Sequence, residues 1–350
     1  MAMGFTSGIA DFDQKQFDAL DTTAGAASSY SRLRQLEQDA RWTGRYLGQF
    51  DGDEVRAAIP VYRYRMRSWP DPSYDPRSWG LPGGIADECS PRASLMVGGC
   101  IDRRTGFHVD AETRTPGKLR KLLVEIARYA ADEDMCLTFP YMYADAKSAL
   151  AAATDDRVIW AELAREAHLL GLSDPGWEST LSSKTRYRLR QDQRRIAAVP
   201  MTVGEESWDE VDAWASGLIA EHNSGKGAHE HPEFVSFRYS GWQDNPDIGL
   251  MAFTARTADL RGVETILLWG NELEVYEIAL TGEESDERFA LYLNLLFHLP
   301  IQYARARGID HIRLGSKTET PKALRGAVFE NLYGGVLSRA ETKRLAHSGS

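Results

Sequence analysis

The chain has 350 residues, of which 43% are hydrophobic and 26% are charged, the composition of a globular protein long enough for two domains. Its formal net charge of −10 excludes a general nucleic-acid coat protein, because such proteins carry a broad basic face. The apolar runs are too short to span a bilayer and the first residues lack a secretion signal, so we expect a cytoplasmic protein without a membrane partner. Three cysteines without CxxC spacing argue against a disulfide framework and against a zinc site.

The first half of the chain is expected to hold a hairpin followed by a helix. Residues 45–50 and 57–64 flank Asp51-Gly52-Asp53, which is a turn signal between two strands. Apolar residues then recur at helical spacing from about Pro116 to Ala131, and a short strand over 136–139 follows. This order of hairpin, helix and strand predicts a mixed α/β unit.

The middle of the chain holds a segment, Ser182–Arg195, whose charge is opposite to that of the whole protein. It contains no Gly or Pro, so we expect a helix. One acid, Asp192, stands against six basic residues: Lys184, Arg186, Arg188, Arg190, Arg194 and Arg195. A cluster of one sign in a protein of the other sign attracts a polyanion. The alternative interpretation is a solvated surface helix without a ligand.

The second half repeats the pattern of the first. A helix is expected to begin near Ser207 and to end at Glu221 and His222. The later elements are strands over 249–255, 265–269 and 273–280, an amphipathic helix from about Asp286 to Arg307 that Pro300 kinks, and a strand over 311–314.

The repeated pattern predicts an α/β fold of two related domains, each with a mixed sheet and flanking helices. We expect the first domain over residues 1–175 and a basic connecting helix over 176–200. The second domain, over 201–350, is expected to carry the active site.

The strand near Val275 holds an ionisable residue where a central strand should be apolar. Since side chains alternate along a strand, Tyr276 is expected on one face and Glu277 on the other. A buried carboxylate is costly unless it is paired or lines a cavity. Glu277 is therefore a candidate general base or an anchor for an amine. The alternative is a carboxylate that pairs with a structural arginine.

A glycine-rich segment follows the helix that ends near His222. It includes Glu221, His222, Asn223 and Lys226, and glycine-rich loops on rigid scaffolds often contact substrates. Its histidines fit no standard zinc spacing, so no metal is expected.

Three cations follow the last strand of the second half. Lys317, Lys322 and Arg325 lie beyond its carboxyl end, where phosphates are often held. The segment is not a Walker loop, and the chain has neither a G-x-S-x-G elbow nor a plausible Cys/His nucleophile pair. Catalysis by positioning is therefore favoured over covalent catalysis.

The order of these motifs resembles the Fem-like branch of the GNAT superfamily, whose members pair two GNAT-like domains. The likeness covers roughly residues 40–335 and rests on four features: a Ser-Ser-Lys-x-Arg-x-x-Leu-Arg helix, a Glu-His-Asn loop, a Val-Tyr-Glu-Ile strand and a Leu-Gly-Ser-Lys turn. It implies transfer of an aminoacyl group from aminoacyl-tRNA to an amine, with no acyl-enzyme and no cofactor.

The resemblance also implies roles for the residues singled out above. Glu277, His222 and Lys317 would act at the reacting amine and ester. Four residues would contact the substrate: Tyr276, Asn223, Lys226 and Glu221. Seven residues would hold tRNA phosphates: Lys184, Arg186, Arg190, Arg194, Lys317, Lys322 and Arg325.

One departure and three alternatives bear on this interpretation. Coiled-coil heptads of a long helical arm are absent, so a small-molecule amine of an antibiotic pathway is favoured over a peptidoglycan-bridge precursor. An acyl-CoA-dependent N-acyltransferase is a further alternative, but the acidic turn Thr281–Ser285 lacks the expected pyrophosphate-binding motif. A non-catalytic binding module would leave the second-domain residues unexplained.

Overall fold

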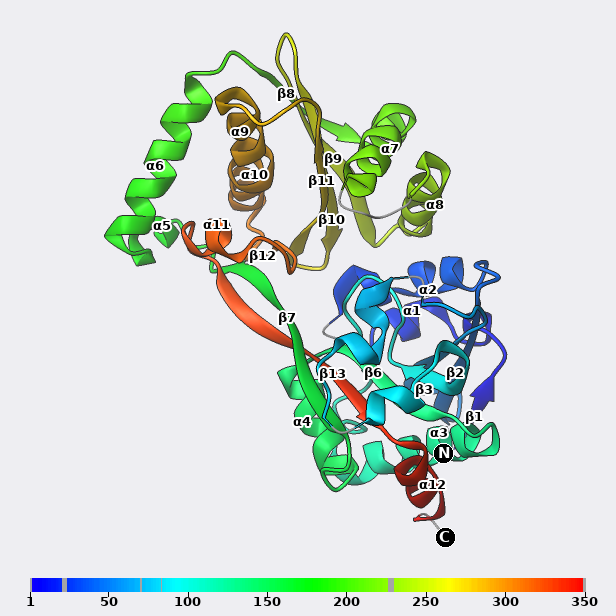
Figure 1. Ribbon diagram of the computed structural model, residues 1–350. Helices are drawn as coiled ribbons and strands as arrows, with labels where there is room; N and C mark the ends of the chain where they lie inside the picture. The colour runs from blue at the N-terminus through cyan, green and yellow to red at the C-terminus, as the bar shows by residue number, and fades with distance from the viewer. Residues whose placement is uncertain (1, 21–23, 70, 83, 226–229, 349–350) are drawn as a thin grey trace. The chain divides into compact units, whose positions relative to one another are not determined.

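The computed structural model describes residues 2–20, 24–69, 71–82, 84–225 and 230–348. The chain forms two compact units (Figure 1): unit 1 comprises Met1–Ala164 and Asn331–Ser350, and unit 2 comprises Arg165–Glu330. These boundaries differ from the expected 1–175, 176–200 and 201–350, because the last strand of the chain pairs within unit 1 and the basic helix packs within unit 2. Across the described residues, no helix is long and apolar enough to cross a membrane.

Unit 1 is built on a mixed sheet in the order β1-β2-β3-β4-β6-β13, with β5 beside β3. Its predicted hairpin is confirmed, with Gly52 in the left-handed region at φ 63° between β2 and β3. The strands are β1 (Ala2–Thr6), β2 (Trp42–Asp51), β3 (Glu54–Tyr64), β4 (Ser94–Val97), β5 (His108–Val109), β6 (Cys136–Tyr143) and β13 (Val328–Leu337). The helices are α1 (Gln14–Asp18), α2 (Tyr30–Leu36), α3 (Pro116–Asp132), α4 (Ala144–Ala153) and α12 (Arg339–His347).

Unit 2 is built on a second set of strands in the order β7-β12-β11-β10-β9-β8, in which only β11 and β12 run parallel among the described strands. Helices α7 and α8 cover one face, and α9 and α10 cover the other (Figure 1). The strands are β7 (Ile159–Leu170), β8 (Thr202–Ser207), β9 (Ile248–Arg256), β10 (Arg261–Trp269), β11 (Glu272–Leu280) and β12 (His311–Arg313). The helices are α5 (Trp177–Thr180), α6 (Ser183–Ala197), α7 (Trp208–Ser224), α8 (Pro232–Gln243), α9 (Asp286–Leu293), α10 (Leu299–Arg307) and α11 (Glu319–Ala323).

The boundaries of the unit 2 helices follow from local chemistry. Ser207 and Glu210 form a capping box at the start of α7, which satisfies free backbone N–H groups there. The predicted helix over 286–307 is present but is interrupted by a π-helical turn, Asn294–His298, between α9 and α10. Pro300 lies two residues after this turn and lacks the N–H that a regular helix would bond to the carbonyl of Leu296, a residue of the turn. The irregularity thus coincides with the backbone hydrogen bond that Pro300 removes.

Candidate functional site

A β-bulge in the middle of β11 shapes the central face of unit 2. Glu277 pairs with Thr265 on β10, but the next pairing skips Tyr276, which is the extra residue of the bulge. Both side chains reach α8: Tyr276 lies with its ring 5.0 Å from that of Trp242, and Glu277 contacts Tyr239. The expectation that they face opposite sides of the sheet is therefore wrong, because a bulge resets the alternation of side chains.

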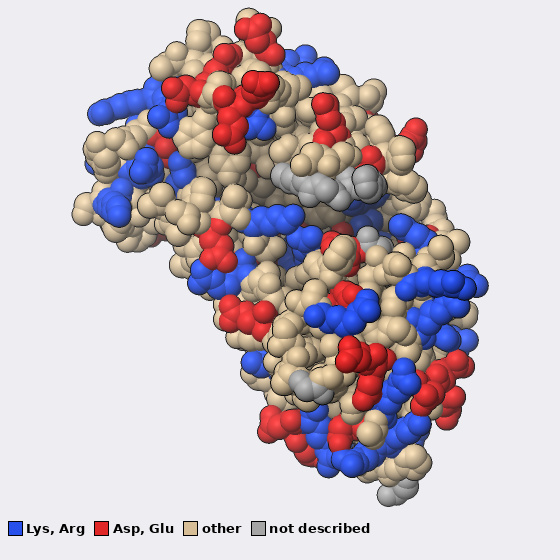
Figure 2. Space-filling model, in the orientation of Figure 1, with Lys and Arg blue, Asp and Glu red and all other residues tan. Residues whose placement is uncertain are grey.

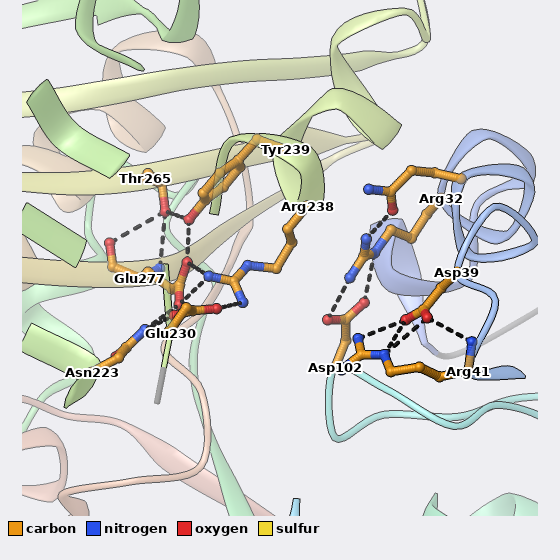
Figure 3. Close-up of polar contacts among 11 residues, drawn as sticks. Arg32, Asp39, Arg41, Asp102, Asn223, Glu230, Arg238, Tyr239, Thr265 and Glu277 are labelled. Carbon is orange, nitrogen blue, oxygen red and sulfur yellow. Dashed lines mark hydrogen bonds and ion pairs between the residues drawn. The ribbon is translucent and has the colours of Figure 1, made fainter. Parts of the chain in front are cut away.

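The carboxylate of Glu277 accepts hydrogen bonds from three side chains (Figure 3). Asn223 Nδ2 lies 3.1 Å away, Arg238 Nη2 donates over 3.0 Å, and the Tyr239 hydroxyl donates over 2.6 Å. The backbone N–H of Glu277 donates to Thr265 Oγ1 over 3.0 Å. The contact with Arg238 corresponds to the alternative interpretation of the sequence, in which Glu277 pairs with a structural arginine.

Arg238 joins Glu277 to a second carboxylate. Its Nη1 donates to Glu230 Oε1 over 2.7 Å, and Glu230 Oε2 accepts from Asn223 over 2.8 Å. Burial opposes the charge of Arg238, but Glu277, Tyr276, Tyr239 and Glu230 together outweigh it and hold the pKa of the guanidinium well above its usual range. Burial and the Glu277 carboxylate together raise the pKa of Tyr239, so its hydroxyl keeps the proton that it donates. We call Asn223, Glu230, Arg238, Tyr239 and Glu277 the Glu277 cluster.

Aromatic rings surround the Glu277 cluster. The Trp208 and Tyr239 rings lie 4.1 Å apart, and the Tyr239 and Tyr276 rings 5.8 Å apart. The cluster holds one more acidic than basic side chain, and aromatic faces attract cations. The oxygens of Glu277 are already engaged by three donors, so any attraction of the cluster for an ammonium group comes from its excess negative charge and not from a free lone pair of Glu277.

The predicted residues at the end of α7 are only partly brought together. Asn223 joins the Glu277 cluster, whereas Glu221 is exposed at the helix end. His222 is half-buried on the same turn. Lys226 lies outside the described residues. No group of three or more possible metal ligands occurs in the part of the chain that the structure describes.

Arg238 was not predicted from the sequence, and Glu230 was given no role there. Val235, Tyr239 and Trp242 form the buried stripe of α8, and Arg238 is three residues from Val235. A charged residue at that spacing lies beside the apolar stripe, and this was the signal available for finding it. Its partner Glu277 is 39 residues away, so local pattern could not name the pair.

The basic helix predicted over 182–195 is confirmed as α6, with Ser182 capping its start by accepting from the Thr185 backbone N–H over 3.1 Å. Its one acid, Asp192, points inward and pairs with Arg325 Nε over 2.8 Å, where the two side chains are 3% and 4% exposed. Four cations are exposed on the other side: Lys184, Arg190, Arg194 and Arg195. The space-filling view shows basic side chains gathered over this part of unit 2, at the upper left (Figure 2).

Arg186 differs from these four cations. It is half-buried, and its guanidinium donates to the backbone carbonyls of Leu181 and Ser179. It therefore braces the start of α6.

The three predicted phosphate ligands after β12 also differ in their burial and contacts. Lys322 is buried, bonds the Gly315 carbonyl over 2.9 Å, and has its pKa lowered by burial to about 8. Arg325 is engaged by Asp192, whereas Lys317 is exposed. The loop that carries Lys317 holds Thr318 at φ 57°, a conformation that costs a β-branched residue about 1–3 kcal/mol and is typical of functional sites.

A fully buried carboxyl lies on the other face of the sheet. Glu264 is next to Thr265 on β10 and so points away from the Glu277 cluster. Neither of its carboxyl oxygens has a hydrogen-bond partner among the described residues. Burial raises the pKa of Glu264 far above its usual range, although Lys322 acts in the opposite direction.

Comparison with known proteins identifies the fold. No family model and no curated protein matches the chain. Among solved structures, FemX matches with a TM-score of 0.63 and 9% identity over 97% of each chain. L-PGS from Bacillus licheniformis matches with a TM-score of 0.54 and 11% identity, over 95% of this chain and 94% of that one. A tandem GNAT protein from the clavulanic acid biosynthesis pathway matches with a TM-score of 0.51 and 13% identity, over 95% and 98%.

These likenesses extend over both units of the chain. They confirm the predicted α/β class of two GNAT-like domains with mixed sheets and flanking helices. At 9–13% identity they establish the fold alone.

Proposed function

We propose that the chain is an acyltransferase that moves the aminoacyl group of an aminoacyl-tRNA to the amine of a small molecule. The observation that carries the proposal is the exposed face of α6, which holds Lys184, Arg190, Arg194 and Arg195 while its one acid is turned inward to Arg325. Such a face attracts a polyanion to one place on a protein of net charge −10. The fold shared with FemX and L-PGS supports this choice of polyanion.

The reaction needs no covalent enzyme intermediate. The amine nitrogen attacks the ester carbonyl carbon, an amide bond forms and the C–O bond to the tRNA ribose breaks. The proton lost by the amine ends on the ribose oxygen. The contribution of the protein is to hold both substrates in line, which can supply a large part of the rate enhancement.

The Glu277 cluster is the proposed acceptor site. Its excess carboxylate and its aromatic surroundings suit the ammonium form of the amine, which releases a proton before it attacks. His222 and Tyr276 complete this side of the site. Lys317, exposed in a strained loop, binds phosphate at the tRNA 3′ end, while Lys322 supports that loop from inside through the Gly315 carbonyl. Arg325 pairs instead with Asp192 of α6.

We infer the class of the acceptor from its chemistry and from one of the structural neighbours. The tandem GNAT protein comes from the clavulanic acid pathway, which supports a secondary-metabolite amine as the acceptor. It also favours an acyl-CoA-dependent N-acyltransferase as the second candidate. Against CoA, Glu283 and Glu284 are exposed beside the start of α9, where a pyrophosphate would be repelled.

The deciding experiment incubates the protein with charged tRNA and candidate amines and detects the amide by mass spectrometry. We expect product with aminoacyl-tRNA and none after RNase treatment of the tRNA before addition. Product that survives this treatment, or that forms only with acetyl-CoA, would refute the tRNA-dependent reaction. A lipid-linked cell-wall precursor as the only accepted amine would instead assign the peptidoglycan-bridge class.

A further inference from the structure

The exposed face of α6 holds an aromatic ring among its cations. At 100° per residue, Tyr187 lies on the same side of the helix as Lys184, Gln191 and Arg194, which are three, four and seven positions away. Tyr187 is 55% exposed. The opposite side, with Leu189, is buried within unit 2.

Tyr187 is held in place rather than left free. Gln191 Nε2 donates to its hydroxyl over 2.8 Å, one helical turn further along. This contact restrains the orientation of the ring without covering its faces. A single exposed tyrosine would be ordinary, because much of any protein surface is apolar.

A second exposed ring lies at the far end of the same surface. Phe289 on α9 is 39% exposed, and the guanidinium of Arg195 lies 5.0 Å from its centroid. Phe289 also stacks on Tyr292, with an interplanar angle of 15°. The surface therefore holds two aromatic rings among its cations: Lys184, Tyr187, Arg194, Arg195 and Phe289.

We propose that this α6 surface binds unpaired nucleotides of RNA, with a base stacked on Tyr187 and the backbone phosphates on Lys184 and Arg194. A charged track with aromatic platforms is the arrangement that binds single-stranded nucleic acid. Paired bases are stacked inside a duplex and cannot cover the ring, so a duplex would use the cations alone. The inference rests on the proposed function, because the RNA in question is the tRNA substrate and the nucleotides are an unpaired stretch of it.

Two kinds of variant separate stacking from charge. Tyr187→Ala removes the ring, and Tyr187→Phe keeps it while losing the contact with Gln191. Arg194→Ala removes a phosphate contact. Phe234→Ala removes a ring of similar exposure, 57%, on α8, away from the basic helix, and serves as the matched control. Alanine favours helix, so neither alanine variant on α6 should unfold it, which circular dichroism checks.

The experiment titrates each variant with a short single-stranded RNA oligonucleotide, a blunt RNA duplex of equal length and charged tRNA, at several salt concentrations. For Tyr187→Ala we expect affinity for the single strand to fall at least about fivefold, with an unchanged salt slope and an unchanged affinity for the duplex. For Arg194→Ala we expect weaker binding of both RNAs and a slope for the single strand that is smaller by about 0.7. Tyr187→Phe and Phe234→Ala should bind as the unaltered protein does.

Equal binding by Tyr187→Ala and the unaltered protein, or an equal loss with strand and duplex, would overturn the proposal. Failure here is distinct from failure of the proposed function. If amide formation requires tRNA but no Tyr187 variant alters binding, only the stacking surface is refuted. If the single strand binds through Tyr187 but amide forms without tRNA, the surface stands and the proposed donor is refuted.

Discussion

The buried pair between Asp192 and Arg325 gives the sharpest test of how unit 2 is held together. Asp192→Asn keeps the shape of the side chain and one acceptor oxygen but removes its charge. Arg325 would then be a buried cation whose contacts, besides the asparagine oxygen, are the Pro321 carbonyl at 2.8 Å and the Phe297 ring at 4.6 Å. Both residues are at most 4% exposed, so water cannot replace the lost carboxylate.

Breaking a buried pair from one side costs about 3–5 kcal/mol, because an uncompensated charge is left behind. The retained acceptor oxygen of asparagine places the expected loss near the lower end, about 3 kcal/mol. With an m-value of about 2 kcal/mol per molar in urea, the midpoint of unfolding should fall by about 1.5 M.

The assay is urea unfolding followed by far-UV circular dichroism, with an unchanged m-value as the check that only stability has changed. The matched control is Glu205→Gln, which breaks an exposed pair with Arg307 whose side chains are 51% and 48% exposed. That control should change stability by less than about 1 kcal/mol. The double variant Asp192→Leu with Arg325→Met should recover most of the loss. If Asp192→Asn behaves like the control, the reasoning about the buried charge is refuted.

Three further predictions concern titratable groups. In the unaltered protein buried Lys322 loses its proton near pH 8 while the unfolded side chain keeps its proton to about pH 10.5, so the free energy of unfolding should rise between these pH values by on the order of 3 kcal/mol. Lys322→Met should remove this rise. Parallel curves of stability against pH for the two proteins would contradict the prediction. Glu264→Gln should stabilise the protein by about 1–3 kcal/mol at pH 8 and by less at pH 5. The reason is that the raised pKa of Glu264 makes the stability of the unaltered protein fall as the pH rises above about 4.5. Thermal melts of both proteins at the two pH values test this prediction. Glu277→Gln should raise the KM for the acceptor amine about tenfold with a smaller effect on kcat; a loss in kcat of about a hundredfold or more at unchanged KM would assign Glu277 as the general base instead.

Local pattern was sufficient for several of the longer helices and strands. Hydrophobic periodicity predicted α3 and the strands β9, β10 and β11, and the absence of helix breakers predicted α6. These signals depend on neighbours within one or two turns. The return of β13 to unit 1 was not predicted, because it depends on pairing between Leu337 and Leu137, 200 residues apart.

The candidate site was less accessible from sequence for the same reason. Glu277 was identified because a charged residue is unusual in a central strand, and that signal is local. The bulge at Tyr276 leaves no mark in the alternation of residue types. The inward orientation of the Asp192 side chain and the burial of Arg325 both depend on the contact between them, which joins residues 133 positions apart.

The division of unit 1 between the two ends of the chain has a consequence for synthesis. Unit 2 is one continuous segment, Arg165–Glu330, and all of it leaves the ribosome before Asn331 does. The β6 strand of unit 1 lacks its β13 neighbour until then, with backbone donors and acceptors unpaired along that edge. The unit encoded first is thus the one completed last, and a nascent chain exposes this edge for most of its elongation. A fragment that ends at Ala164, the last residue of the first segment of unit 1, would leave this edge of β6 open permanently, so we expect such a fragment to aggregate.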